Sequence, residues 1–301
     1  MKLWVGIISI TNFVSNHLHA QTIWTENFNN SCASNCAANT YTGINGAWSI
    51  NSTGTNAVHA NQWYISGAEC GMNSGECGTV CGTTNSSLHI GVNFLGIIVD
   101  VGASYLAGAS PFGSSATDKR TDSPTINRSC YNNIVLTFNY LEGGQATTDN
   151  ATLWIFDGST WSQLVDMPKT FCCDGSGNPV ACDGSNQGLW EAFTISLPLS
   201  TFDNPLFRIG FRWANNNDNI GTDPSFAVDD ITISGQTIGG GIEPNTELIC
   251  NATEITNSGA TSLNTYSFLS DMTCNNQVGN NSAADVDEFG SACSGELSQA
   301  V

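Results

Sequence analysis

The chain contains many short segments in which apolar and polar residues alternate, and no stretch keeps the period of an amphipathic helix. A period of two places neighbouring side chains on opposite faces of a β-strand. So many short strands over roughly 200 residues predict an all-β fold, an antiparallel jelly-roll β-sandwich. The strands are expected at Thr22–Phe28, Trp63–Ser66, Ser87–Gly91, Ile134–Leu141, Ala151–Asp157, Glu191–Pro198, Leu206–Trp213 and Ser225–Ser234.

The last of these segments carries two adjacent carboxylates, Asp229 and Asp230, inside an apolar run. In a strand, one of the two must point toward the interior or a neighbouring loop. A buried carboxylate is costly unless it is paired or bound to a cation. Because the chain has 7 Lys and Arg against 26 Asp and Glu, Ca²⁺ is the natural partner. The alternative is that one aspartate caps a turn and the other faces water.

The N-terminus is typical of an exported protein. Lys2 precedes a short apolar run, and a polar stretch then ends in a small residue, Ala20. This pattern predicts a signal peptide over residues 1–20, and the apolar run is too short to cross a membrane. No later segment is long and apolar enough to span a bilayer. We therefore expect an extracellular or cell-surface location.

The twelve cysteines also favour export, because their spacings indicate disulfides more readily than zinc ligands. Vicinal cysteines rarely bond to each other, so we expect Cys172 or Cys173 to pair with Cys182 and pin a hairpin loop, while the other pairs further away. Nine cysteines precede residue 240 and three follow it. Both counts are odd, so either one bridge joins the two regions or the chain is incomplete.

The formal charge of −19 disfavours nucleic acid and anionic membranes as partners, because both require basic surfaces. Removing residues 1–20 would make the protein one unit more negative. The apolar fraction of 40% is enough for a folded core.

Composition divides the chain into parts. A β-sandwich module is expected over residues 21–236, followed by a glycine-rich linker at 237–244. Residues 245–301 have their own cysteines and short β-like stretches, which indicate a second, incomplete small β-domain. The final segment, Glu296–Val301, is typical of the beginning of a strand, so we expect the protein to continue beyond it.

The first and last segments resemble a known family. The residues Trp24-Thr-Glu-Asn-Phe28, followed by Trp48, and the residues Phe226–Ile233 resemble the terminal strands of MAM-like jelly-roll modules. They are most similar to the choice-of-anchor modules of exported Bacteroidetes surface proteins. The resemblance covers residues 22–235 and implies a non-catalytic module of an adhesin, or one beside the catalytic domain of a secreted protease or glycosidase.

The same resemblance implies a calcium site shared by the first and last strands, at Glu26 and at Asp229 or Asp230. Asn27 or a backbone carbonyl of the opening loop could complete the oxygen shell. Further along, Cys250–Ile255 is similar to the start of a pre-peptidase C-terminal type β-domain.

Other candidate sites are weaker. Only His59 and His89 remain after removal of the signal peptide, and no nucleophile elbow or zinc-protease motif is present, so hydrolytic chemistry has little support. Asp174–Asn178 resembles the start of a calcium loop but lacks its glycine and its final glutamate. The polar loop Asn215–Asn219, with Asp223, suits either a ligand-binding loop or a plain turn.

The tryptophans Trp154, Trp161, Trp190 and Trp213 could stack on sugar rings. Burial in the core is the expected fate of most of them, and Trp161, placed in a turn, is the best candidate for exposure.

Taken together, the residues predict a non-catalytic extracellular binding or adhesion module, stabilised by calcium, with a glycan or protein ligand. The alternatives are an accessory region of a secreted protease or glycosidase, whose catalytic domain lies outside this chain, and a structural spacer. The sequence does not predict an oligomeric state.

Overall fold

The computed structural model describes residues 20–29, 36–37, 41–69, 73–77, 85–92, 100–108, 113–129, 131–184, 187–198, 204–237, 266–267 and 278–279. The expected signal peptide, the linker beyond residue 237 and most of the expected second domain lie outside these residues. Gln21–Ile238 form one compact unit. Beyond this unit, the described residues form β18 (Tyr266–Ser267) and β19 (Val278–Gly279), which pair antiparallel.

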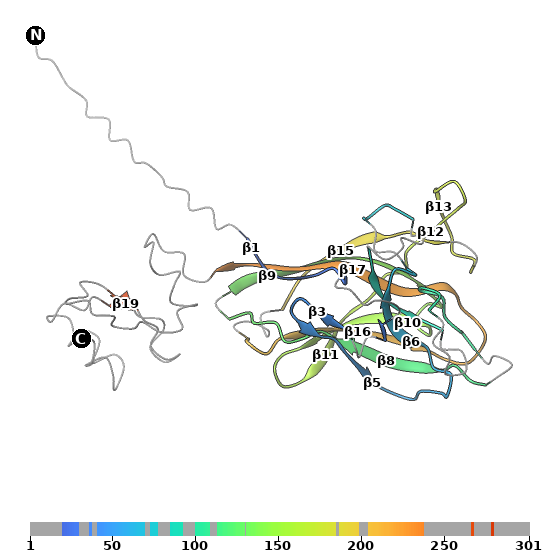
Figure 1. The fold of residues 1–301 in the computed structure, drawn as a ribbon, viewed down its shortest axis with the longest axis horizontal. Coiled ribbons are helices and arrows are strands. Elements are labelled where there is room, and N and C mark those ends of the chain that lie inside the picture. The colour runs from blue at the N-terminus through green and yellow to red at the C-terminus, as the bar shows by residue number, and fades with distance from the viewer. Residues whose placement is uncertain are drawn as a thin grey trace, which may run out of the picture. The chain divides into compact units, whose positions relative to one another are not determined.

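The first layer of the compact unit is a seven-stranded sheet, in which β9 and β17 run side by side (Figure 1). The two strands share the longest ladder of the fold, and β1 pairs with β17 outside the main order. The members, in order, are β15 (Glu191–Ser196), β9 (Tyr131–Gly144), β17 (Thr222–Thr237), β7 (Ser87–Gly91), β6 (Gln62–Ser66) and β2 (Cys36–Ala37), with β1 (Gln21–Glu26) beside β17.

The second layer is a five-stranded antiparallel sheet. Its order is β11 (Trp161–Asp166), β10 (Asn150–Phe156), β16 (Arg208–Asn215), β8 (Thr117–Asp122) and β5 (Ser49–Ser52). Two small sheets accompany the layers. One joins β12 (Cys172–Cys173) to β13 (Pro179–Val180) and β14 (Gln187–Gly188), and the other pairs β3 (Thr42–Gly43) with β4 (Gly46–Ala47).

Aromatic side chains join the two layers into one core. The Phe211 ring, on the inner face of β16, lies 5.3 Å from the Phe138 ring of β9 and 5.4 Å from the Phe226 ring of β17, measured between centroids. All three side chains are at most 2% exposed. The predicted fold class, an all-β antiparallel sandwich, is confirmed.

The eight expected strands are all present, with shifts of one to three residues at most ends, but β5, β8 and β11 were not expected. β8 was missed because its sequence, Thr-Asp-Lys-Arg-Thr-Asp, contains no apolar residues and so shows no alternation of apolar and polar positions. Lys119 nevertheless faces inward, where its Nζ donates to the Asn61 carbonyl over 3.1 Å and burial lowers its pKa to about 8. The placement of Trp161 in a turn was wrong. The turn is formed by residues 157–160, and Trp161 begins β11.

The long strand β17 changes partner partway along its outer edge. β7 pairs with Phe226–Val228, whereas β1 pairs with Ile231–Gly235. Asp229 and Asp230 lie between these two ladders, and the register with β9 also shifts between Asp229 and Thr232. The register shift is a β-bulge, and it changes which face of the strand the following side chains point to. Both halves of β17 therefore keep their apolar residues on the core side.

Candidate functional site

The first and last strands of the compact unit bring three of the predicted calcium ligands to one place. Glu26, the last residue of β1, is paired with Ile231, directly after the two aspartates of β17. Asn27 follows Glu26 in the chain. We call the group formed by Glu26, Asn27, Asp229 and Asp230 the strand junction.

Glu26 is a buried carboxylate with three hydrogen-bond donors around it. Its Oε1 accepts from the Phe28 backbone N–H at 2.9 Å and from the Tyr41 hydroxyl at 3.0 Å, and its Oε2 accepts from Trp48 Nε1 at 3.4 Å. The side chain is 2% exposed. Gly43 of β3 lies against it so closely that a Cβ there would overlap Oε2. These contacts hold the carboxylate in one position.

Asp229 and Asp230 differ sharply in environment. Asp229 is 1% exposed, whereas Asp230 is exposed and has the left-handed backbone conformation, with a φ of 51°. The Asp230 backbone N–H donates to Asp229 Oδ1 at 2.8 Å. Burial, followed by the negative charges of Asp230 and Glu26, raises the pKa of Asp229 to about 9. The expectation that one aspartate points inward is therefore confirmed, and no described cation lies against it.

A pocket of about 440 Å³ opens at the strand junction. Glu26, Asn27 and Asp230 contribute to its wall, and Asp229 lies outside that wall. The remaining lining residues are Thr25, Asn29, Ile44, Ile231 and Thr232. Carboxylate, amide and hydroxyl oxygens are the donors that Ca²⁺ prefers.

The oxygen-bearing side chains of the strand junction are of the types that bind calcium, but they are not arranged around one point. Within the described part of the chain, no three His, Cys, Asp or Glu side chains converge closely enough to hold a metal ion. A calcium ion here would therefore rely on Asp230, Asn27 and backbone oxygens around the pocket, with Asp229 turning toward it. Calcium binding stays a prediction.

A second buried cluster has the residue types of a hydrolase triad. His89 Nε2 lies 2.9 Å from Asp100 Oδ1, and His89 Nδ1 lies 3.3 Å from Ser87 Oγ. Ser87 and His89 are both fully buried, and the Ser87 hydroxyl donates to the Glu69 carbonyl. This hydroxyl therefore has neither solvent access nor a free proton for the histidine. The Ser66 hydroxyl of β6 also donates to Asp100, so the arrangement ties β6, β7 and the segment at Asp100 together and offers no nucleophile.

The disulfide expectation for the vicinal cysteines is confirmed. Cys172 is bonded to Cys182, and Cys173 is bonded to Cys77, 96 residues away. The loop closed by the Cys172–Cys182 bridge contains a turn in which Asp174 Oδ1 accepts from the backbone N–H groups of Ser176 and Asn178. This carboxylate is occupied by its own loop, which explains the faint likeness to a calcium loop.

The polar loop before β17 is likewise bonded within itself. Asn216 Nδ2 donates to Asp218 Oδ2 at 2.9 Å, and the Ile220 N–H donates to Asp218 Oδ1 at 2.8 Å. Asp223, inside β17, instead bonds to a distant segment, where it accepts from the Ser104 hydroxyl and the Tyr105 N–H. The contacts of Asp218 account for the composition of the loop as turn chemistry.

The tryptophans divide into two groups. Five of the seven described are between 0% and 6% exposed, as expected for a core: Trp24, Trp48, Trp63, Trp190 and Trp213. Trp154 and Trp161 are partly exposed, and both belong to the outer face of the five-stranded sheet. Trp161 was expected to be exposed. Trp154 was among the tryptophans for which burial was the more favoured expectation, and it is partly exposed instead.

Comparison with known proteins yields likenesses in architecture. No family profile and no curated protein matches the chain. The K1 cleaved adhesin domain of Lys-gingipain from Porphyromonas gingivalis W83 is 16% identical, with a TM-score of 0.41 over 71% of this chain and 98% of that domain. The K3 domain is 13% identical, with a TM-score of 0.38 over 71% of this chain and 100% of its own.

A carbohydrate-binding module studied for specific mannan recognition, TmCBM27, is 9% identical, with a TM-score of 0.34 over 73% of this chain and 99% of its own. At these identities and scores, the likenesses concern fold type, and no ligand or site transfers from them.

Proposed function

We propose that this chain carries a non-catalytic extracellular binding or adhesion module of a larger secreted or cell-surface protein, with a glycan or protein as its ligand. The observation that carries the proposal is the pair of partly exposed tryptophans. The compact unit buries five tryptophans but leaves Trp154 and Trp161 accessible on one sheet face. Large aromatic rings that are held rigidly at a surface are typical of binding sites.

The disulfides and the strand junction support an extracellular setting. The two bridges at Cys172 and Cys173 are of the kind that persists in oxidising compartments. No helix in the described ranges is long and apolar enough to cross a membrane. Calcium at the strand junction would neutralise the negative charge that the buried Asp229 carries when it ionises, and so would hold the ends of the module together.

The ends of the module also suit a place within a longer chain. Gln21 at the start of β1 is paired with Gly235 near the end of β17, so the chain enters and leaves the sandwich at adjacent points. Modules with neighbouring ends can be inserted beside other domains without disturbing them. An accessory region of a secreted protease or glycosidase would use the same binding role, and the reading frame downstream of Val301 separates that alternative from an adhesin.

The test is direct binding by the full chain. The chain is applied to a glycan array and to immobilised fibronectin, fibrinogen and collagen, in the presence of calcium. A binding module gives saturable binding to at least one ligand class. Absence of saturable binding to every glycan and protein tested would leave a structural spacer as the better description.

A further inference from the structure

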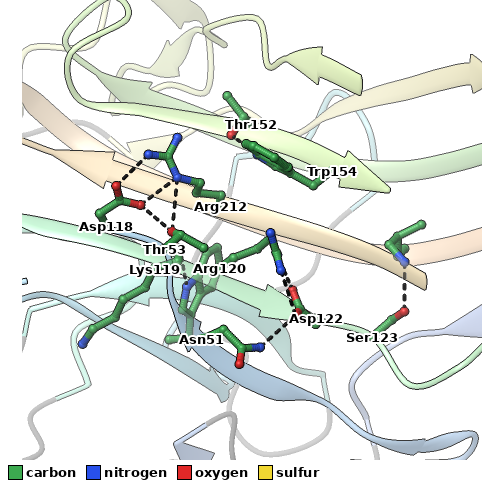
Figure 2. A network of polar contacts seen from close by, with 12 residues as sticks. Asn51, Thr53, Asp118, Lys119, Arg120, Asp122, Ser123, Thr152, Trp154 and Arg212 are labelled. Carbon is green, nitrogen blue, oxygen red and sulfur yellow. Dashed lines mark hydrogen bonds and ion pairs between the residues drawn. The ribbon is translucent and has the colours of Figure 1, made fainter. Parts of the chain in front are cut away.

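The outer face of the five-stranded sheet carries an ordered set of charged side chains on its two central neighbouring strands. On β16, Arg212 Nε and Nη2 donate to Asp118 Oδ1 and Oδ2, both at 2.7 Å. On β8, Arg120 Nε and Nη2 donate to Asp122 Oδ1 and Oδ2 at 2.6 and 3.2 Å. Figure 2 shows both pairs, with Thr53 also bonded to Asp118. Bidentate pairs of this kind fix the orientation of both partners.

The two partly exposed tryptophans belong to the same set. The Arg120 guanidinium carbon lies 3.7 Å from the centroid of the Trp161 ring and 5.6 Å from that of Trp154. The Arg212 guanidinium carbon lies 5.9 Å from the Trp154 centroid on the other side. Trp154 Nε1 donates to Thr152 Oγ1 at 2.8 Å, as Figure 2 shows. Cation–π contacts and this hydrogen bond therefore hold both rings in place.

A glycine makes room for this arrangement. Gly210 of β16 lies beneath Arg120 and Trp161, and a Cβ there would lie 2.9 Å from Arg120 Cδ and 3.0 Å from a Trp161 ring carbon. The absence of a side chain lets the guanidinium and the indole lie close to the sheet. A preorganised group of this kind, held on strands rather than loops, is the arrangement that binding sites need.

Part of the hydrogen-bonding capacity of the face is unused. Arg212 employs Nε and Nη2, and no residue in the described ranges accepts from its Nη1. Its side chain is 25% exposed and that of Asp118 is 18% exposed. Donors and acceptors therefore lie beside partly exposed indole rings on one face.

We propose that this face binds a neutral glycan chain. Sugar rings stack on Trp154 and Trp161, while their hydroxyl groups donate to Asp118 and accept from Arg212, the partly exposed pair of this face. The inference rests on the proposed binding function and names its site and ligand class. A pyranose ring has an apolar face, which suits an indole, and a rim of hydroxyl groups, which suits alternating donors and acceptors.

The charges of the face favour a neutral chain over a charged one. Each of Arg120 and Arg212 is matched by an aspartate, so the two pairs cancel locally. An anionic polysaccharide would be repelled by the aspartates and by the formal charge of −19 on the whole protein. A cationic polysaccharide would meet the partly exposed guanidinium group of Arg212.

The experiment is affinity gel electrophoresis of the full chain in hydroxyethylcellulose, galactomannan, xylan, β-1,3-glucan and glycogen, with polygalacturonate as the charged comparison. Titration calorimetry then measures the affinity for any polysaccharide that retards the protein. The wild type should be retarded by at least one neutral polymer and not by polygalacturonate. Trp154→Ala and Trp161→Ala should each weaken binding at least tenfold.

The matched control is Phe171→Ala, which removes an aromatic side chain that is 56% exposed outside this face and should leave binding unchanged. Trp161→Phe keeps a smaller ring over Arg120 and should give a smaller loss than Trp161→Ala, which separates a stacking role from misfolding. Each variant is compared with the wild type in its thermal midpoint.

The outcomes separate this inference from the proposed function. Retardation by neutral polymers that survives both tryptophan variants overturns the location of the site but keeps the binding function. No retardation by any neutral polymer overturns the glycan inference, while saturable binding to an immobilised protein would still support a binding module. Failure on both panels overturns both.

Discussion

Asp229 should make the calcium-free protein less stable as the pH rises, and calcium should oppose this effect. In the folded protein without a cation, burial and the neighbouring carboxylates raise the pKa of Asp229 from its ordinary value of 3.8 to about 9. Between these two values the folded state keeps a proton that the unfolded state releases, so the stability falls as the pH rises. From pH 4 to pH 7 the loss approaches about 4 kcal/mol, at 1.36 kcal/mol per pH unit.

The assay is thermal unfolding of the wild type and Asp229→Asn in EDTA from pH 4 to pH 8. Asparagine has no proton to lose. Between pH 4 and pH 7 the free energy of unfolding of the variant should therefore rise relative to that of the wild type by about 4 kcal/mol, which is roughly 8–16 °C in the midpoint for a domain of this size. Glu76→Gln, a change at an exposed carboxylate, is the control and should give a constant difference across the pH range.

Calcium is then added back at pH 7. A Ca²⁺ ion that binds the ionised carboxylates of the folded protein stabilises it by about 2.7 kcal/mol at a concentration of 100 times its Kd. The wild-type midpoint should rise, and the Asp229→Asn midpoint should rise much less. Two parallel pH profiles in EDTA would refute the reasoning about burial, and a wild type indifferent to both EDTA and Ca²⁺ would refute the calcium site.

Three further changes test the packing around the sites. Gly43→Val should lower stability by about 1–3 kcal/mol in urea unfolding, because its side chain would displace the buried carboxylate of the strand junction, whereas Gly175→Val, in open space, should change little. Burial raises the pKa of Glu142 to about 8. Between pH 4.5 and pH 7, the free energy of unfolding of Glu142→Gln should therefore rise by about 3 kcal/mol relative to that of the wild type. A difference in stability that does not change with pH would contradict the raised pKa. Opening the bridge at Cys77, which closes 96 residues, should cost about 4.7 kcal/mol, against about 2.7 kcal/mol for the 10-residue bridge at Cys182; equal losses would argue against the loop-entropy explanation.

Several elements of the fold could be predicted from the sequence because their signal is local. Alternation along β9, β10 and β16 indicated strands, since one face of each is buried in the sandwich core. The pairing of a vicinal cysteine with Cys182 followed from short-range geometry alone. The inward position of one aspartate followed from the two-residue period of a strand.

Other elements could not be predicted, because tertiary contacts reverse the local signal. β8 is charged along most of its length, yet its arginine and aspartates form pairs on the outer face, and its lysine reaches a carbonyl inside the sandwich. Lys119 and Asp118 are satisfied by residues distant in sequence, Asn61 and Arg212, whereas Arg120 and Asp122 pair with each other within β8. His89 likewise has a partner outside its own strand, Asp100, which follows 11 residues later.

The sequence by itself determined that the chain forms short antiparallel strands, that two carboxylates interrupt the last of them, and that one of these lies inside. These properties depend on the two-residue alternation of side chains along a strand, which can be recognised from a short stretch of sequence. Only the tertiary structure decided which aspartate is buried, because β17 exchanges β7 for β1 as its neighbour at that point. It also decided that Trp154 and Trp161 meet Arg120 on one face, because strand order, which sets such contacts, depends on long-range pairing.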